Sequence, residues 1–347
     1  MSVEFSELKE SARQVVAGAE LPLDEKATWA QIVELGWLLV GIPEDMGGLG
    51  MGVQGTCVIH TELGRGLSAA PYLPVMLAIG ALCEAEFGDR DTWLERILGG
   101  ELVTASLAAS HVELQTNASG DEVLNGLLSA VQSADDASHV LVWTAKSDAL
   151  ALVALDQAGV ELVSRPTWDV TRRLFDIHLS GVALANQTIL AKGSAAQNIV
   201  NSLLSQRDFA LGADAVGGAA ALLATTVEHL QTRRQFGRPL ALFQALKHRC
   251  ADIKAISAGA EAMLFDALAR IADDSASAEA EHRGKAAKYL ATSTFARVGE
   301  EALQLHGGIG MAEEHPCHLY LKRALLSDNL GRDAASYDYD IAASLLD

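Results

Sequence analysis

The sequence lacks the features that mark several large classes of protein. No stretch of about 18 apolar residues runs without a polar interruption, so we expect no membrane-spanning helix. The N-terminal residues MSVEFSELKESARQ are polar and charged and contain no apolar segment of the kind that a secretory signal needs. We therefore expect a cytoplasmic protein that does not insert into a membrane.

Cysteine is scarce and widely spaced. No pair forms a CxxC motif or shows the spacing of metal ligands, so we expect no metal site. In a cytosolic chain, isolated cysteines are expected to be buried thiols. The cysteines are Cys57, Cys83, Cys250 and Cys317.

Basic residues are also fewer than acidic ones. The 347 residues include 26 Lys and Arg against 45 Asp and Glu, which gives a net charge of −19. Binding to nucleic acid needs clustered cations that neutralise phosphates, so this balance argues against a nucleic-acid role. Half of the residues are hydrophobic, which predicts a folded chain with a large core and two or three domains.

The pattern of apolar residues divides the chain into three parts. Residues 1–100 are expected to form an N-terminal helical domain. Residues 29–40, WAQIVELGWLLV, have helical spacing, and the Pro- and Gly-rich segment 42–52 ends that helix. A second helix is expected through Val58, Ile59 and Leu63.

Residues 101–190 have the pattern of a β-domain. Short apolar runs such as HVLVWTA and ALALVAL alternate with turn sequences such as NASGDE, KSD and DQAG. Because no helical segment separates these runs, we expect an antiparallel, β-barrel-like domain.

Residues 191–347 are rich in Ala and Leu with a period of 3.6 residues. Helices are expected over 195–234, through Leu242 to Ile256, over 278–306 and after Pro316. Long helices with apolar faces bury them against one another, which predicts a C-terminal four-helix bundle. The fold class is therefore mainly α with a central β-domain.

Two motifs in the bundle carry chemical information. In the first, arginines flank a glycine turn between two long helices, where they can bind an anion, although a solvated helix end would look similar. In the second, three glycines within four residues allow a ligand to approach the backbone closely. The motifs are Arg233-Arg234-Gln235-Phe236-Gly237-Arg238-Pro239-Leu240 with Gln244, and Gln304-Leu305-His306-Gly307-Gly308-Ile309-Gly310 with Glu314 and Pro316.

In this order and about 70 residues apart, the motifs resemble the RxxFGxxLxxxQxxQ and QxxGGxGxxxExP signatures of the acyl-CoA dehydrogenase family. Residues 34–50, ELGWLLVGIPEDMGGLG, resemble that family's ELGxxGxxxPExxGGxG. The resemblance extends over nearly the whole chain and implies the α,β-dehydrogenation of a CoA thioester with hydride transfer to FAD.

The resemblance also implies how FAD is held. In that family the flavin lies across a subunit interface, with its ring on one subunit's β-domain and its diphosphate end on the neighbour's bundle. Carried over to this chain, the diphosphate-binding residues are Arg233, Phe236, Gln244, Gln304, Gly307 and Gly308. This half of the site is complete.

The ring-binding half departs from the family pattern. The family's ALTEPxxGSD run is replaced here by residues 105–111, ASLAASH, which contain neither the TE pair nor the GSD loop. The sequence LNG at 124–126 is followed by LLSAVQSA instead of the family's WIT strand. The hydroxyl of Ser106, Ser110 or Ser129 is an alternative to the missing ring-binding hydroxyls.

The catalytic carboxylate is missing from both places where the family carries it. One position lies 17 residues after Glu314 and is Gly331, and the other, in the first bundle helix, is Arg207. Asp208 and Asp328 are candidates for a shorter, displaced base, although capping or solvated aspartates are the simpler interpretation. For Arg207 we expect a local ion pair at the surface with Asp208, while a contact with a partner chain or a CoA phosphate stays open.

A chain with an intact diphosphate half and no base resembles the smaller subunit of the heteromeric bacterial acyl-CoA dehydrogenases of steroid side-chain degradation. We therefore expect an α2β2 heterotetramer in which this chain completes the FAD site of a homologous catalytic subunit. The resemblance further implies an acyl-CoA substrate and an electron-transferring flavoprotein as electron acceptor. Two alternatives remain, namely a homomeric dehydrogenase with an Asp base and a non-catalytic scaffold subunit.

Overall fold

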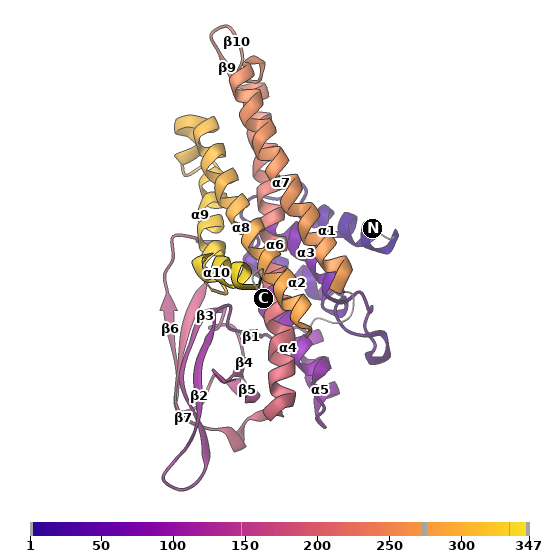
Figure 1. Cartoon of the computed structure of the whole chain (residues 1–347), viewed down its shortest axis with the longest axis vertical. Helices are drawn as coiled ribbons and strands as arrows, with labels where there is room; N and C mark the ends of the chain where they lie inside the picture. Colours follow the sequence, from indigo (N-terminus) through magenta and orange to yellow (C-terminus); the bar gives the residue numbers. More distant parts are fainter. Residues whose placement is uncertain (1–2, 147, 272–275, 333, 345–347) are drawn as a thin grey trace.

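The computed structural model describes residues 3–146, 148–271, 276–332 and 334–344 and has an elongated shape (Figure 1). The helix expected over 29–40 is shorter than the sequence suggested. Gly36, at a φ of 68°, breaks it, and residues Trp37–Leu39 form a separate 3₁₀ turn. Glycine at a left-handed position commonly ends a helix. The N-terminal helices are α1 (Val3–Val16), α2 (Glu25–Glu34), α3 (Gly52–Arg65), α4 (Tyr72–Glu84) and α5 (Arg90–Leu98).

The strands form two open four-stranded sheets, with orders β1-β4-β5-β8 and β2-β3-β7-β6. Every pairing within them is antiparallel except β1 with β4, which is parallel. The expected β-domain is thus present, and its sheets do not close into a barrel. The strands are β1 (Val103–Ala105), β2 (Ser110–Thr116), β3 (Glu122–Gln132), β4 (His139–Trp143), β5 (Ala149–Ala154), β6 (Val160–Arg165), β7 (Leu174–Ala183) and β8 (Thr188–Lys192).

The C-terminal part is the expected helical bundle. Its central helix α6 has 40 residues and is long and apolar enough to span a membrane by length and composition alone, but 72% of that apolar stretch is buried inside the protein. It is therefore the core helix around which the others pack. The helices are α6 (Gly193–Thr232), α7 (Gln244–Ile271), α8 (Ala278–His306), α9 (Cys317–Asn329) and α10 (Ala334–Ser344).

Small residues bring α3 and α6 into backbone contact. A Cβ atom built on Gly64 would lie 2.2 Å from the carbonyl oxygen of Asp214, and one on Gly217 would lie 1.8 Å from that of Thr61. Only glycine leaves room for such an approach. The N-terminal helices are consequently fixed to the bundle's central helix.

A buried ion cluster joins three parts of the chain. Asp214 of α6 accepts from Arg323 Nε of α9 at 3.0 Å and pairs with Arg172 Nη2 of the loop before β7 at 3.0 Å. Arg323 Nη1 also donates to the carbonyl oxygen of Ser68 at 2.8 Å. Each buried charge has an opposite charge beside it, as burial requires. The cluster therefore fixes the β-domain and the N-terminal helices against the bundle.

Candidate functional site

The first motif forms a short hairpin at one end of the bundle. Strand β9 (Arg234–Gln235) pairs with β10 (Arg238–Pro239), and the turn between them has a φ of 53° at Phe236 and 75° at Gly237. Two successive positive φ values characterise a type I′ turn, which a bulky residue adopts only at a cost. The turn leaves the Phe236 side chain 87% exposed.

Arg233 and Gln244 flank this hairpin on the two helices that it connects. Arg233 caps α6, with its backbone N–H donating to the carbonyl oxygen of His229, and its own carbonyl accepts from Leu240 N at 2.9 Å. Gln244 begins α7. Both side chains are exposed, so they face outward from the same end of the bundle.

The second motif lies at the end of α8. Gln304, Gly307 and Gly308 are all exposed. A Cβ atom built on Gly307 or Gly308 would meet nothing within 4 Å, so the backbone of this loop is open to an approaching group. Gly307 has a φ of 65°, which favours glycine at this position.

A stack of histidines connects the two motifs. The His306 ring lies 4.6 Å from the His229 ring, next to the first motif, and 4.6 Å from the His315 ring, beyond the glycine loop. His306 Nδ1 hydrogen-bonds the carbonyl oxygen of Ala302 at 2.8 Å, and its buried Nε2 has no partner among the described residues. Burial lowers the pKa of each of the three rings, so the stack is uncharged near neutral pH. Sequence reasoning missed His229 and His315, because no local pattern shows which distant loops meet.

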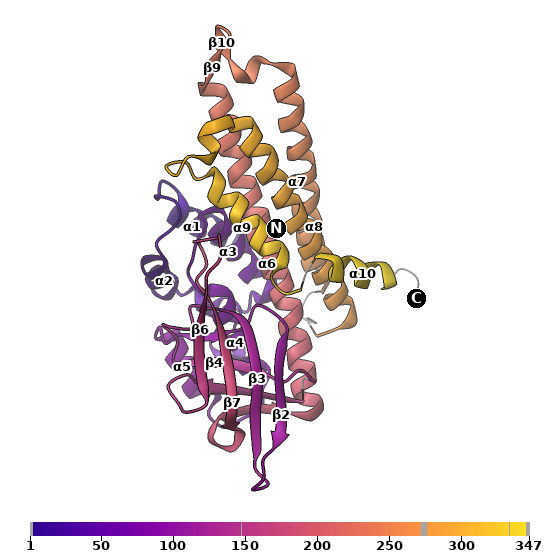
Figure 2. The same cartoon turned by 90° about the vertical axis from the view of Figure 1, so that its left-hand side faces the viewer.

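These residues fit the diphosphate end of FAD. An exposed guanidinium is a bidentate partner for phosphate oxygens, and an open glycine loop offers backbone N–H donors. Figure 2 shows the β9–β10 hairpin at one end of the molecule, while the sheets lie beside the part of α6 that is remote from the hairpin. Because α6 begins directly after β8 and ends at the hairpin, its 40 residues, about 60 Å at 1.5 Å per residue, separate the hairpin from that strand.

The two positions where the family carries its catalytic Glu meet in space. A Cβ atom built on Gly331 would lie 3.3 Å from Arg207 Cζ and 2.5 Å from the hydroxyl oxygen of Tyr337. Gly331 has a φ of 81°, and its N–H donates to the carbonyl oxygen of Leu107 at 2.6 Å. The space that a carboxylate would occupy is therefore filled.

Arg207 and Asp208 form a buried ion pair, not the surface pair that we expected. Arg207 Nε lies 3.0 Å and Nη2 2.9 Å from Asp208 Oδ1, and the two residues are 3% and 4% exposed. Tyr337, from α10, donates to the same oxygen at 2.8 Å. The expectation failed because α10 and the loop at Gly331 cover this face of α6, which the local sequence does not reveal. Asp208 Oδ1 consequently accepts from both Arg207 and Tyr337.

Asp328 is engaged in the same region. Its Oδ1 accepts from Thr292 Oγ1 at 2.9 Å, and its backbone carbonyl accepts from the buried Lys288 Nζ at 2.9 Å. Lys288 Nζ also lies 4.3 Å from the centre of the Tyr337 ring. Asp328 thus links α8 to α9.

Two of the three serines considered as substitutes for the ring-binding hydroxyls, Ser106 and Ser110, are bonded within the β-domain, and Ser129 is half-buried. Ser106 Oγ donates to the carbonyl oxygen of Ser129 at 2.6 Å, and Ser110 Oγ donates to that of Trp143 at 2.5 Å. Both Ser106 and Ser110 are buried. Their hydroxyls stabilise the turn between β1 and β2 and the neighbouring strands.

Two family models match the chain. Residues 5–101 match the acyl-CoA dehydrogenase N-terminal domain, and residues 197–331 match the acyl-CoA dehydrogenase C-terminal domain.

Individual proteins show the same similarity. Acyl-CoA dehydrogenase IpdE2 of Mycolicibacterium smegmatis is 30% identical over 85% of this chain and 80% of its own length. The solved Tcur3481–Tcur3483 steroid ACAD variant has a chain with a TM-score of 0.84 at 26% identity, covering 99% of this chain and 98% of the other. A chain of the ChsE4–ChsE5 complex of Mycobacterium tuberculosis shares the fold, with a TM-score of 0.86 at 24% identity, covering 100% and 98%.

Proposed function

Because this chain belongs to the acyl-CoA dehydrogenase family of FAD-dependent oxidoreductases, we propose that it completes the FAD site of a homologous catalytic subunit. In this proposal the chain supplies the residues around the diphosphate, and the partner supplies the ring-binding strands and the base. The assembly would then oxidise a CoA thioester between its α and β carbons.

The observation that carries the proposal is the filled space at Gly331. A side chain there would collide with the hydroxyl of Tyr337, and the alternative base position holds Arg207, whose charge is neutralised by Asp208. A general base must reach the proton that it removes. Within the described part of the chain, both family positions for that group are occupied by a buried, hydrogen-bonded cluster instead.

The exposed end of the bundle supports the other half of the proposal. An aromatic residue held at a positive φ stores backbone strain, and such strain is concentrated at functional sites; its ring here is 87% exposed and open to a partner. Phe236 has this position, and Arg233 lies beside it with its guanidinium exposed.

When bound, FAD accepts a hydride from the substrate. This chain's residues would hold its diphosphate end and exclude water from it. Arg233 would pair with the diphosphate, while Gln244 and Gln304 would donate hydrogen bonds. The backbone of Gly307 and Gly308 would approach the phosphate oxygens closely.

The name of one relative supports a heteromeric assembly and a substrate class. The Tcur3481–Tcur3483 steroid ACAD joins two differently named proteins. On this basis we propose a heteromeric assembly acting on the CoA thioester of a steroid side chain. The α2β2 stoichiometry, the cytoplasmic location and an electron-transferring flavoprotein as acceptor are further parts of the proposal that the sequence resemblance implies.

The flavin content of purified protein tests the proposal. This chain should be colourless when purified alone and should form a yellow complex with one FAD per heterodimer when co-expressed with a catalytic acyl-CoA dehydrogenase from the same gene cluster. A yellow, active preparation of this chain alone would contradict the proposal and favour a homomeric enzyme with an Asp base. A stable complex whose flavin content does not depend on Arg233 would favour the scaffold alternative.

A further inference from the structure

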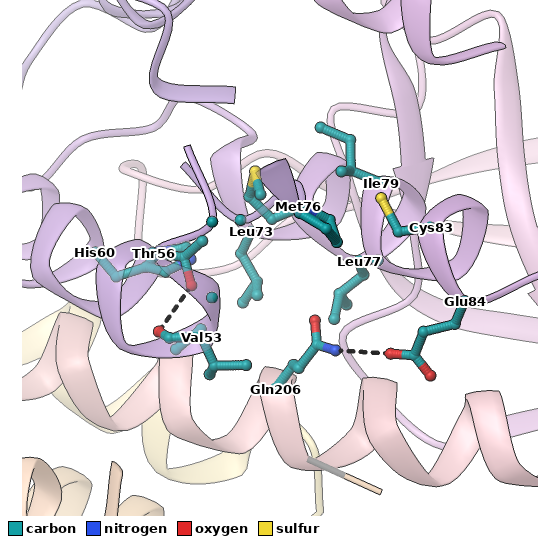
Figure 3. Close-up of a pocket in the computed structure, with 16 residues that line it drawn as sticks. Val53, Thr56, His60, Leu73, Met76, Leu77, Ile79, Cys83, Glu84 and Gln206 are labelled. Carbon is teal, nitrogen blue, oxygen red and sulfur yellow. Dashed lines mark hydrogen bonds between the residues drawn. The ribbon is translucent and has the colours of Figure 1, made fainter. Parts of the chain in front are cut away.

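A cavity of about 380 Å³ lies between α3, α4 and the central helix α6, with the loop at Gly41–Gly52 closing one side (Figure 3). This volume is within the range of small-molecule binding sites. From α6, only Gln206 and Ala210 line the cavity. With about 100° per residue, Asp208 points to the opposite face of that helix. The cavity is therefore separate from the cluster of Arg207, Asp208 and Tyr337.

Most of the cavity wall is apolar, and none of the described residues that line it is Lys or Arg. The residues of α4 that line the cavity recur at helical spacing, so one face of this helix forms part of the wall. Its apolar side chains are those of Pro43, Val53, Leu73, Met76, Leu77, Ile79, Cys83 and Ala210.

His60 and Thr56 are the buried polar residues among the described residues of this wall, and the Thr56 hydroxyl donates to the carbonyl oxygen of Val53 at 2.9 Å. His60 is 5% exposed, and its ring lies 4.8 Å from the Tyr72 ring. Neither ring nitrogen makes a hydrogen bond to the residues that the structure describes. Burial lowers the pKa of His60 to about 3, so the ring is neutral and offers one N–H donor and one acceptor nitrogen. A neutral imidazole without a hydrogen bond to the protein leaves its ring nitrogens available to a group in the cavity.

The rim of the cavity carries a second polar group. Glu84 Oε1 accepts from Ser202 Oγ at 2.6 Å and from Gln206 Nε2 at 3.3 Å, as Figure 3 shows for Gln206. A carboxylate at the mouth of a cavity without cationic residues disfavours the entry of an anion. The site therefore selects against free carboxylates, phosphates and CoA itself.

We propose that this cavity binds an uncharged, largely apolar small molecule carrying a hydroxyl or ketone oxygen that hydrogen-bonds His60. A hydroxyl can pair with either nitrogen of the neutral imidazole, and a ketone can accept from its N–H. The apolar body of the ligand fills the space between α3 and α4.

Three related probes test the chemistry by isothermal titration calorimetry on the full chain. These are 2-naphthol, which carries a hydroxyl, naphthalene, which carries no oxygen, and 2-naphthoate, which is anionic. We expect 2-naphthol to bind about tenfold more tightly than naphthalene, the effect of about one neutral hydrogen bond. We expect 2-naphthoate to bind more weakly than both. Equal affinities, or no binding up to the solubility limit, would overturn the proposal.

Two variants locate the site. His60→Phe should lower the affinity for 2-naphthol about tenfold and leave that for naphthalene unchanged, whereas His178→Phe, at an exposed histidine, should change neither. Gly80→Leu should abolish binding of both, since a Cβ at Gly80 projects toward the Gln206 side chain at 2.9 Å and the added atoms enter the cavity. Because its nearest neighbour is a flexible side-chain end, Gly80→Leu tests the site even if His60→Phe fails to fold. Binding that survives Gly80→Leu would overturn the assignment.

Discussion

The hydroxyl oxygen of Tyr337 lies only 2.5 Å from the point where a side chain at Gly331 would begin. The phenol of Tyr337, from α10, therefore occupies the space that a side chain at position 331 would need. The same phenol donates to Asp208, which in turn neutralises Arg207. Positions 207 and 331 thus take part in a structural contact between α6 and the C-terminal helix.

This contact makes Gly331 sensitive to any side chain. Gly331→Ala should destabilise the protein by the cost of a left-handed residue, about 1–2 kcal/mol, plus that of the collision with Tyr337. Gly47→Ala is the matched control, because Gly47 has the same φ of 81° and no atom within 4 Å of a built Cβ. Urea denaturation measures the difference between the two variants, and Tyr337→Phe should reduce it. Equal destabilisation at both glycines would show that no collision occurs.

The buried pair should respond differently to single and double substitution. Arg207→Met leaves Asp208 charged and unpaired, which should destabilise the fold by about 3–5 kcal/mol. Replacing both residues, Arg207→Met with Asp208→Leu, should cost much less than the single change, because no isolated charge remains.

The control for this cycle is Arg270→Met, in an exposed pair with Asp266 on α7, which should cost about 0.5 kcal/mol or less. Denaturation curves of the wild type, Arg207→Met, Asp208→Leu and the double variant supply the coupling free energy. A double variant as unstable as the sum of its parts would contradict the buried-pair interpretation.

Arg233 should affect FAD without affecting folding. In the complex with the catalytic subunit, Arg233→Gln should weaken FAD binding about 10- to 100-fold, since a charge-assisted hydrogen bond contributes about 1.5–3 kcal/mol. The melting temperature of the Arg233→Gln complex without FAD should equal that of the wild-type complex, because the Arg233 side chain is exposed. Arg297→Gln, at another exposed arginine of the bundle, is the control. Fluorescence titration of the apo-complex with FAD measures both, and equal affinities would exclude a role for Arg233.

Much of the helical fold could be predicted because helical periodicity is a local property. The helix expected over 278–306 is confirmed with those bounds, and Ser277 caps it by accepting from Ala280 N at 3.1 Å. The order of strands could not be predicted in the same way. β1 pairs with β4 in parallel because the two strands between them in sequence, β2 and β3, belong to the other sheet. No local sequence pattern encodes this arrangement.

In the candidate site, too, local features could be predicted and contacts between distant segments could not. Motif spacing selected Arg233 and the glycine loop, but not the His229–His306 contact between residues 77 positions apart, nor Tyr337 over Gly331. The adjacency of Arg207 and Asp208 within an apolar helix was the one local signal for a buried pair. An opposite-charge pair in such a stretch is more easily buried than either charge alone.

The titration of His60 makes the stability of the protein depend on pH. Burial is the main reason that the pKa of His60 falls from 6.5 to about 3. The negative charge of Asp214 raises this pKa, and the positive charges of Arg172 and Arg323 lower it. Below pH 6.5 the unfolded chain binds a proton that the folded chain does not, so this residue's contribution to the free energy of unfolding is lost progressively as the pH falls from 6.5 to 3. The slope from one proton is about 1.4 kcal/mol per pH unit.

His60→Gln should remove this slope, because glutamine does not titrate. Urea denaturation at pH 7.5, 6.0 and 5.0 should give a variant whose stability falls less steeply than that of the wild type, by about 1.4 kcal/mol per pH unit below 6.5. His178→Gln, at an exposed histidine on β7, should keep the wild-type slope. The same comparison separates burial from ligand effects, since it is made without any probe in the cavity. If the His60→Gln variant loses stability as steeply as the wild type, folded His60 takes up its proton at the same pH as in the unfolded chain, and below about pH 6.5 its ring presents two donors and no acceptor to the cavity.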